Sequence, residues 1–142
     1  MIHALQRKSR SHRTMVMGKA NKRQKNIYTV VLKALVEAKK VIRPGITAGD
    51  IDKQAREIIV RAGYGNAFGH ATGHGLGLRV HEPPRVFHDN KTILLKDMVF
   101  TVEPGIYLNS FGGVRIEDMI LVTDNGCRTL TKTTRKLLEI NE

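Results

Sequence analysis

The 142-residue sequence predicts an α+β domain in which two helices precede a sheet. Three observations predict this class. Apolar residues recur with helical spacing between about residue 21 and residue 63, and β-branched residues concentrate in short, turn-bounded segments after residue 98. The helical and strand-like segments are grouped along the chain, whereas a parallel α/β fold would alternate them. The length is sufficient for one sizeable core and insufficient for two.

The first predicted helix has one apolar stripe and stops at Pro44-Gly45. Its expected inward residues follow three- and four-residue spacing: Ile27, Val30, Val31, Ala34, Leu35, Ala38, Val41 and Ile42. A second helix is expected to begin with the capping pair Thr47 and Asp50 and to end at Gly63. Its expected inward residues are Ile51, Ala55, Ile58, Ile59 and Ala62.

The texture of the sequence changes after the second helix. The stretch FGHATGHGLGLRVHEPP is rich in glycine and histidine, and we expect it to form a loop. Strands are expected at residues 99–102, 114–123 and 127–130, with Asp124-Asn125-Gly126 as the hairpin turn between the last two. The expected sheet therefore lies almost entirely in the C-terminal third of the chain.

Positive charge is concentrated near the N-terminal end. Of a formal net charge of +11, nine charges fall within residues 1–36, where no acidic residue precedes Glu37. Residues 1 to about 20 show no clear period, so we expect an arm or an edge strand around Thr14 to Met17. A basic arm can bind nucleic acid, but no aromatic residue interleaves this cluster to stack on bases. A solvated surface is therefore the favoured interpretation over a nucleic-acid partner.

Composition and cysteine usage indicate a cytoplasmic protein without a membrane partner. No apolar run approaches the roughly 20 residues that a membrane span needs. The opening MIHALQRKSRSHR lacks the apolar segment of a secretory signal. Cys127 is the one cysteine and cannot form an internal disulfide. We expect it to be a buried or half-buried strand residue and not a nucleophile.

Three parts of the sequence contain residues suited to chemistry. They are the histidines His70, His74 and His81, then Glu103 in TVEPG, and Glu117 in GGVRIED. Neutral imidazole and carboxylate are ligands for Mn, Fe, Co and Zn, and a metal held by them can convert water into a nucleophile near neutral pH. The residue types therefore indicate metal-assisted hydrolysis.

Each of these residues also has a structural interpretation. The histidines could be surface residues of a loop, Glu103 could end a strand, and Glu117 could pair with Arg115 on an exposed face. A phosphate-binding P-loop is excluded because the glycine cluster lacks the Lys-Ser/Thr pair. A zincin helix is excluded because His81-Glu82 is followed by two prolines.

Taken together, three blocks resemble the motifs of prolidases and aminopeptidases P. The blocks are FGHATGHGLGLRVHEPPRV, LLKDMVFTVEPGIYL and GGVRIEDMILVTDNGCRTLT, and the resemblance spans roughly residues 14–131. It implies the pita-bread fold, in which helices flank a curved, mainly antiparallel sheet. It also implies a dinuclear centre, usually of manganese or cobalt, that cleaves the peptide bond preceding proline. Methionine aminopeptidases share GHG and HEPP, but EPGIY and GGVRIED are more similar to the proline-specific branch.

The resemblance also implies roles for individual residues. It implies three metal ligands, which are His74, Glu103 and the bridging Glu117. His70 and His81 resemble the histidines that grip the substrate and stabilise the transition state. Glu103 would also pass a proton between water and the leaving amine. Arg115 resembles a residue that orients the acidic ligands.

The N-terminal residues depart from the family pattern. Family members carry two aspartate ligands upstream, the second in a stretch resembling SDxTRT. The corresponding residues 9–14 read SRSHRT, with Arg10 in place of that aspartate, and no acid before Glu37 replaces either one. We therefore expect residues 1–13 to be a basic arm unlike the family. Residues 14–142 are expected to be the C-terminal part of the catalytic domain.

These observations predict an incomplete Xaa-Pro dipeptidase-like or aminopeptidase-like metallopeptidase that is inactive alone. At most one weakly held divalent ion, manganese or else cobalt or zinc, is expected in this chain. The expected partners are a second copy or a polypeptide with the complementary N-terminal half, and the intact family acts on proline-containing dipeptides or peptides. The alternative is a non-catalytic binding module whose basic arm contacts nucleic acid or protein.

Overall fold

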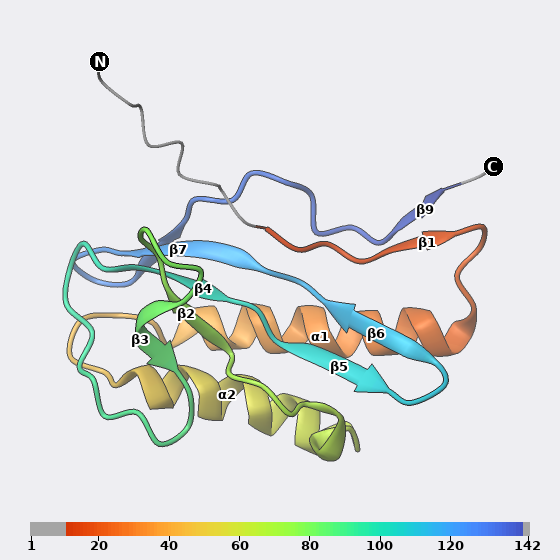
Figure 1. Cartoon of the computed structure of the whole chain (residues 1–142), viewed down its shortest axis with the longest axis horizontal. Helices are drawn as coiled ribbons and strands as arrows, with labels where there is room; N and C mark the ends of the chain where they lie inside the picture. The colour runs from red at the N-terminus through yellow and green to blue at the C-terminus, as the bar shows by residue number, and fades with distance from the viewer. Residues whose placement is uncertain (1–10, 141–142) are drawn as a thin grey trace.

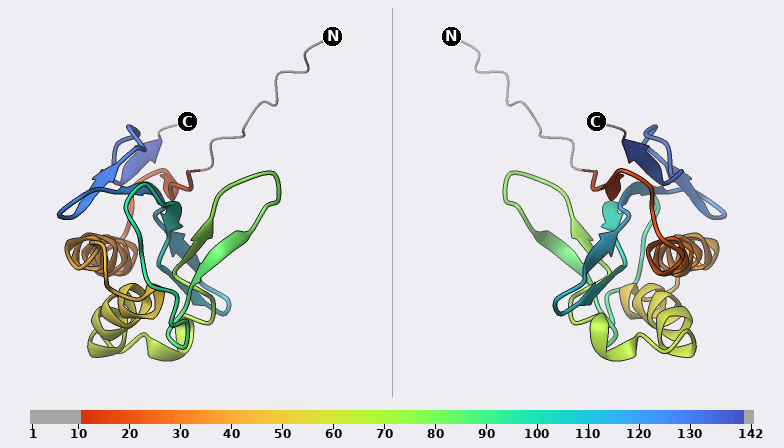
Figure 2. Two further views of the ribbon diagram at one scale, coloured as in Figure 1. Left: turned by 90° about the vertical axis from the view of Figure 1, so that its left-hand side faces the viewer. Right: turned by 90° about the vertical axis from the view of Figure 1, so that its right-hand side faces the viewer.

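The computed structural model describes residues 11–140, in which two helices lie side by side against one side of the strands (Figures 1 and 2). The elements in chain order are β1 (Met15–Met17), α1 (Lys22–Lys40), α2 (Ala48–Arg61), the 3-10 helix η1 (Gly65–Ala67), β2 (Gly73–Gly75), β3 (Glu82–Val86), β4 (Val99–Val102), β5 (Gly105–Leu108), β6 (Gly112–Arg115), β7 (Asp118–Val122), β8 (Cys127–Thr129) and β9 (Leu138–Ile140). Two helices followed by strands confirm the α+β prediction.

Helix α1 forms because an apolar stripe coincides with a strong N-terminal cap. Asn21 and Gln24 form a capping box, in which each side chain accepts a hydrogen bond from the other residue's backbone N–H. Most of the predicted inward residues are fully buried, and Tyr28, which was not predicted, joins them. These residues pack against α2 and the strands in one apolar core.

Helix α2 begins and ends where the sequence predicts. Thr47 and Asp50 form the expected capping box, and Gly63, with φ +83°, ends the helix in a left-handed conformation. The prediction that Ala62 faces inward is wrong, because this residue caps the C-terminus and is exposed where the chain turns away. Asp52 lies instead on the buried side, with no exposed surface.

The sheet is mainly antiparallel, as predicted. Five strands pair in the order β3-β2-β4-β7-β8, and all four contacts are antiparallel. The turn at residues 124–126 joins β7 and β8, and Thr123 N–H donates to the Gly126 carbonyl across it. Strands β1 and β9 form a separate parallel pair, which confirms an edge strand near residues 14–17. Cys127 is half-buried in β8, also as predicted.

Strands β4 to β7 form one long hairpin, and its backbone pairing is interrupted at one point. Strands β4 and β7 pair on one side of the interruption, and β5 and β6 pair on the other. The prediction of one continuous strand over residues 114–123 is therefore wrong. Pro104 has no N–H to donate, so regular pairing lapses opposite Ile116 and Glu117, and only Ile116 N–H donates to the Pro104 carbonyl. Glu103 and Glu117 lie at this interruption.

The glycine- and histidine-rich stretch is more ordered than predicted. The expected loop contains β2 and β3, which form an antiparallel hairpin next to β4. The hairpin was not predicted because its glycines give no alternation of apolar and polar residues. The same glycines allow the close approach of the paired strands. A Cβ on Gly73 would overlap the Thr101 carbonyl, and one on Gly75 would overlap the Pro83 carbonyl.

A buried carboxylate ties the two ends of the described chain to α1. Asp118 accepts hydrogen bonds from Arg13, Lys39 and Arg135, with donor-to-oxygen distances of 2.8 to 3.0 Å. Burial alone would raise the pKa of Asp118, but the hydrogen bonds and charges of Arg135 and Lys39 outweigh it and hold the pKa below its ordinary value. The group therefore remains ionised with no exposed surface.

Neither helix in residues 11–140 is long and apolar enough to cross a membrane.

Candidate metal centre

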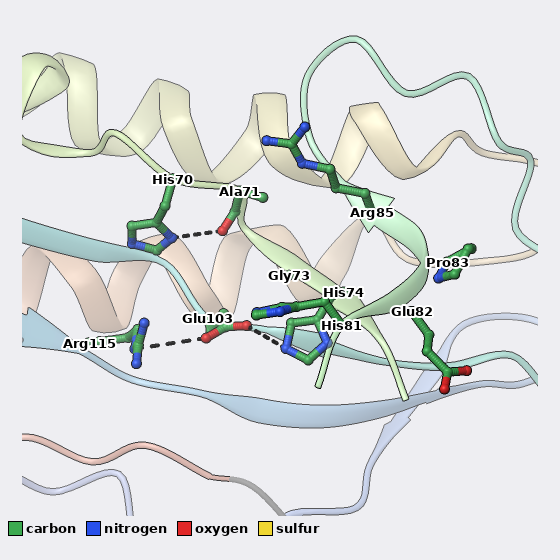
Figure 3. Close-up of a pocket in the computed structure, with 10 residues that line it drawn as sticks. All are labelled: His70, Ala71, Gly73, His74, His81, Glu82, Pro83, Arg85, Glu103 and Arg115. Carbon is green, nitrogen blue, oxygen red and sulfur yellow. Dashed lines mark hydrogen bonds and ion pairs between the residues drawn. The ribbon is translucent and has the colours of Figure 1, made fainter. Parts of the chain in front are cut away.

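A cavity of about 480 Å³ opens beside the β2–β3 hairpin (Figure 3). Five of the six predicted site residues line it: His70, His74, His81, Glu103 and Arg115. The sixth, Glu117, is not among the lining residues in the described part of the chain and is almost completely buried behind the cavity. The structure thus brings residues from three separate sequence blocks to one place.

An ion pair on α2 fixes the segment that carries the histidines. Arg56 forms two hydrogen bonds with Asp52, at 2.8 and 3.0 Å, and donates to the carbonyl oxygens of Phe68 and His70. Asp52 also accepts hydrogen bonds from the backbone N–H and the hydroxyl of Thr72. Both ends of the segment 68–72, which lies just before His74, are therefore hydrogen-bonded to the same Arg56–Asp52 pair.

His74 is oriented as a ligand through its Nε2 atom. Its Nδ1 lies 2.8 Å from the carbonyl oxygen of Gly75, which can only accept, so Nδ1 carries a proton. In the neutral ring, Nε2 then has a free lone pair. That atom lies 3.3 Å from Oε1 of Glu103. A proton on Nε2, or a metal ion bound by both groups, makes this contact favourable.

Glu103 is held by neighbours on the same strand face. The Thr101 hydroxyl donates to its Oε1 at 3.0 Å, and the backbone N–H of His74 donates in turn to that hydroxyl. On the other side, Arg115 Nε lies 3.8 Å from Glu103 Oε2. Thr101 was missed in the sequence, although the alternation of a strand places residues 101 and 103 on one face.

Glu117 contacts the chain near its start. Its Oε2 accepts a hydrogen bond from the His12 backbone N–H at 3.0 Å and also contacts Nδ1 of the His12 ring. Within residues 11–140, His12, Glu103 and Glu117 are the group whose ligand atoms all lie within 4.8 Å of one another. The predicted ligand His74 contacts Glu103 but is not in this group, whose histidine is the unpredicted His12. Arg10, where the second family aspartate was expected, lies outside the described residues.

His70 presents a neutral ring to the cavity. Its Nδ1 lies 2.8 Å from the Ala71 carbonyl oxygen, and its Nε2 is buried without a hydrogen-bond partner in the described structure. Burial lowers the pKa of His70, and the hydrogen bond to Ala71 and the charge of Glu103 only partly offset this effect. Nε2 is therefore an acceptor that a ligand in the cavity can satisfy.

His81 lies at the open side of the same cavity. Its side chain is exposed, and its ring meets the ring of His74 edge-on, with 4.4 Å between the centroids. The two histidines come from neighbouring parts of the β2–β3 hairpin. The hairpin pairing, hidden from the sequence analysis by its glycines, is what brings them together.

The residues present fit a divalent cation. Glu103 and Glu117 are 7% and 1% exposed, and burying two carboxylates close together is costly unless a cation balances them. Carboxylate oxygens and an imidazole with its other nitrogen bonded to a carbonyl are typical of metal ligands and their surroundings. Arg115 balances only one of these charges, from the Glu103 side.

Comparison with known proteins identifies the family. The model of metallopeptidase family M24 matches residues 7–124, which is more than half of the chain. The chain belongs to this family. It is 53% identical over 126 residues to a Xaa-Pro dipeptidase of Pyrococcus horikoshii and 51% identical to one of Pyrococcus furiosus. In each case the match covers 89% of this chain and 36% of the relative.

Solved structures of this family confirm the fold. The prolidase of Pyrococcus horikoshii superposes with a TM-score of 0.87 at 52% identity, covering 90% of this chain and 37% of that one. A Xaa-Pro dipeptidase of Bacillus anthracis gives 0.89 at 42% identity, covering 92% and 37%. The M24 chain described here therefore has part of the pita-bread fold, as predicted. It spans about a third of the length of the relatives it matches.

Proposed function

We propose that this M24 chain contributes the histidine and glutamate side of a proline-specific dipeptidase or aminopeptidase site. The observation that carries the proposal is the buried pairing of His74 Nε2 with Glu103 Oε1 at 3.3 Å, close to a second buried carboxylate, Glu117. The relatives named as Xaa-Pro dipeptidases support the substrate class. A lone, half-buried Cys127 is consistent with the cytoplasm, which we propose as the compartment.

His74, Glu103 and Glu117 would hold the metal, which we propose to be a single, weakly bound manganese, cobalt or zinc ion. When bound, such an ion acts as a Lewis acid and activates water for hydrolysis. A second ion would find few further ligands, because within residues 11–140 one group of three ligand-bearing side chains, His12, Glu103 and Glu117, has its ligand atoms within 4.8 Å of one another.

The other cavity residues would act on the substrate. His70 Nε2, a buried acceptor, would receive an N–H group of the bound peptide. His81, at the exposed side, would contact the substrate and stabilise the transition state. Glu103 would transfer a proton from water to the leaving amine, and Arg115 would keep its carboxylate in place from 3.8 Å.

We further propose that the chain needs a partner for activity. The matched relatives are about two and a half times as long, and we propose that the residues that complete their sites lie in the part this chain does not match. A second polypeptide with the complementary part, or a second copy of this chain, would supply the missing surface.

The test is manganese-dependent hydrolysis of proline dipeptides by the purified 142-residue chain. We expect negligible turnover alone. Turnover should appear when the chain is co-expressed with the remaining part of the Pyrococcus horikoshii relative, and His74→Ala should abolish it.

Two outcomes would contradict this proposal. Robust turnover by the chain alone, lost in His74→Ala, would show that no partner is needed. Absence of turnover with the complementary part present, together with salt-sensitive binding to nucleic acid, would favour the binding-module alternative.

A further inference from the structure

We propose that His12 is a metal ligand, so that this chain binds one divalent ion through His12, His74, Glu103 and Glu117 and prefers zinc or cobalt to manganese. The inference rests on the metal site of the proposed function and adds a ligand that the three motif blocks do not contain. His12 belongs to the segment expected to be a basic arm, within the SRSHRT stretch that corresponds to a family ligand motif, but it was not itself expected to be a ligand.

The position of His12 is set by hydrogen bonds with the residues just before β7. Glu117 N–H donates to the His12 carbonyl at 3.0 Å, and His12 N–H donates to Oε2 of Glu117 at the same distance. The next two residues continue the contact. Arg13 donates to the Glu117 carbonyl and to Asp118, and the Thr14 hydroxyl bonds both the N–H and the carbonyl of Arg115. These hydrogen bonds fix the backbone of His12 and of the two residues that follow it.

Three of the four proposed ligands lie close together in the described structure. One ring nitrogen of His12 and one oxygen from each of Glu103 and Glu117 lie within 4.8 Å of one another. Metal ligands at 2.0 to 2.3 Å from a shared ion necessarily lie within about 4.6 Å of one another, so only small side-chain movements are needed. His74 lies outside this group, and its Nε2 reaches Glu103 from the cavity side, at 3.3 Å. A movement of the His74 ring toward the group would let all four residues hold one ion.

Charge supports the same arrangement. Nδ1 of His12 contacts Oε2 of Glu117, and a proton on Nδ1 makes that contact favourable. A divalent ion can take the place of that proton. The two carboxylates would balance the charge of the ion, and glutamates that are 7% and 1% exposed are costly to bury without cations nearby.

The ligand types determine which ion is preferred. Carboxylate and water suit manganese, whereas imidazole suits zinc, iron, nickel and copper, and the general affinity order also places zinc and cobalt above manganese. A site with two imidazoles and two carboxylates should accordingly discriminate against manganese more strongly than a site with a carboxylate in place of His12.

The experiment is calorimetric titration of the 142-residue chain with zinc chloride and, separately, manganese chloride. We expect one zinc ion per chain. His12→Ala should weaken zinc binding at least tenfold, since losing even a hydrogen-bonding partner of a ligand typically costs about 10 to 100-fold. His88→Ala is the matched control, because its side chain is 52% exposed against 50% for His12, and it should bind zinc normally.

A second variant distinguishes loss of the ligand from loss of the fold. His12→Asp keeps a ligand at this position but removes the imidazole, so it should retain binding and narrow the preference for zinc over manganese. Circular dichroism of each variant checks the fold.

The outcomes separate this inference from the proposed function. Normal zinc binding by His12→Ala, with binding lost in His74→Ala, would overturn the role of His12 and leave the proposed site intact. Unchanged binding in both variants would refute the site itself. An unaltered zinc-to-manganese ratio in His12→Asp would refute the preference assigned to the imidazole.

Discussion

At Asp118, a single carboxylate connects segments that are more than one hundred residues apart in the sequence. Arg13 precedes β1, Lys39 lies in the last turn of α1 and Arg135 precedes β9, and all three donate to this one side chain. The carboxylate has no exposed surface, while Arg13, Lys39 and Arg135 are 9%, 16% and 34% exposed. Removing the charge would leave three cations facing one another, two of them largely buried.

We predict that Asp118→Asn lowers the free energy of unfolding by about 3 to 5 kcal/mol at neutral pH, the usual cost of breaking a buried ion pair. The folded-state pKa of Asp118 lies below the unfolded value of about 3.9, so its stabilisation is present above about pH 4 and is lost as the pH falls through the folded-state pKa. The difference between wild type and variant should therefore shrink in acid.

Urea unfolding followed by circular dichroism at several pH values provides the measurement. Asp124→Asn is the control, since Asp124 is 70% exposed and pairs with the 54% exposed Lys96. It should change stability little at any pH. A difference for Asp118→Asn that stays constant from neutral pH to below pH 3 would disprove the assignment.

At the scale of one element, α2 carries two Arg–carboxylate pairs with the same spacing and different environments. Arg56 pairs with Asp52, whose side chain is 0% exposed, and Arg61 pairs with Glu57, whose side chain is 52% exposed. Only the first pair also bonds the segment that carries the histidines. The exposed Arg61–Glu57 pair is therefore a control for the buried Arg56–Asp52 pair on the same helix.

We predict that Arg56→Met destabilises the fold by about 3 to 5 kcal/mol, because Asp52 would be buried without its cation. Arg61→Met should cost no more than about 1 kcal/mol. Chemical denaturation measures both. Hydrogen exchange should also become faster at residues 68–72 in Arg56→Met alone, and equal effects of the two variants would contradict the proposed tether.

Elements with a regular sequence pattern were predictable, and those that depend on distant contacts were not. The two helices and the capping box at Thr47 follow from local spacing and local hydrogen bonds. The β2–β3 hairpin did not follow, because glycine leaves no apolar alternation to detect. The break between β6 and β7 depends on Pro104, which lies between the partner strands β4 and β5. Residues 114–123 alone contain no sign of it.

The candidate site shows the same division. Five residues that the motif resemblance singled out line one cavity in the structure: His70, His74, His81, Glu103 and Arg115. Thr101, Asp52 and His12 were missed. Asp52 was missed because an aspartate within a helix looks solvent-exposed until tertiary structure buries it. His12 was missed because it pairs with a glutamate 105 residues away.

For the molecule as a whole, large apolar side chains remain on the described surface. Leu78 is 82% exposed and Val80 is 48% exposed at the tip of the β2–β3 hairpin, and Leu95 is 59% exposed. Strands β3 and β8 are the outer strands of the five-stranded sheet. Exposed apolar residues and sheet edges of this kind commonly become interfaces.

We predict that the chain self-associates, or binds the complementary part of a longer M24 relative, through the hairpin tip. Sedimentation velocity over a range of concentrations should give a mass above that of one chain. Leu78→Gln should reduce the association, whereas Val60→Gln, at a 54% exposed position on α2, should not. A single-chain mass at every concentration, with no binding to the complementary part, would contradict this prediction.

The close approach of the backbones at Gly73 and Gly75 has a consequence for any mutational scan of this chain. Alanine at either position would place a methyl group on the carbonyl oxygen of Thr101 or of Pro83. The displaced strand would carry His74 away from Glu103, since His74 lies between the two glycines. In a scan selected for function, these glycines should therefore tolerate substitution as poorly as the metal ligands do, although neither has a side chain that could bind an ion.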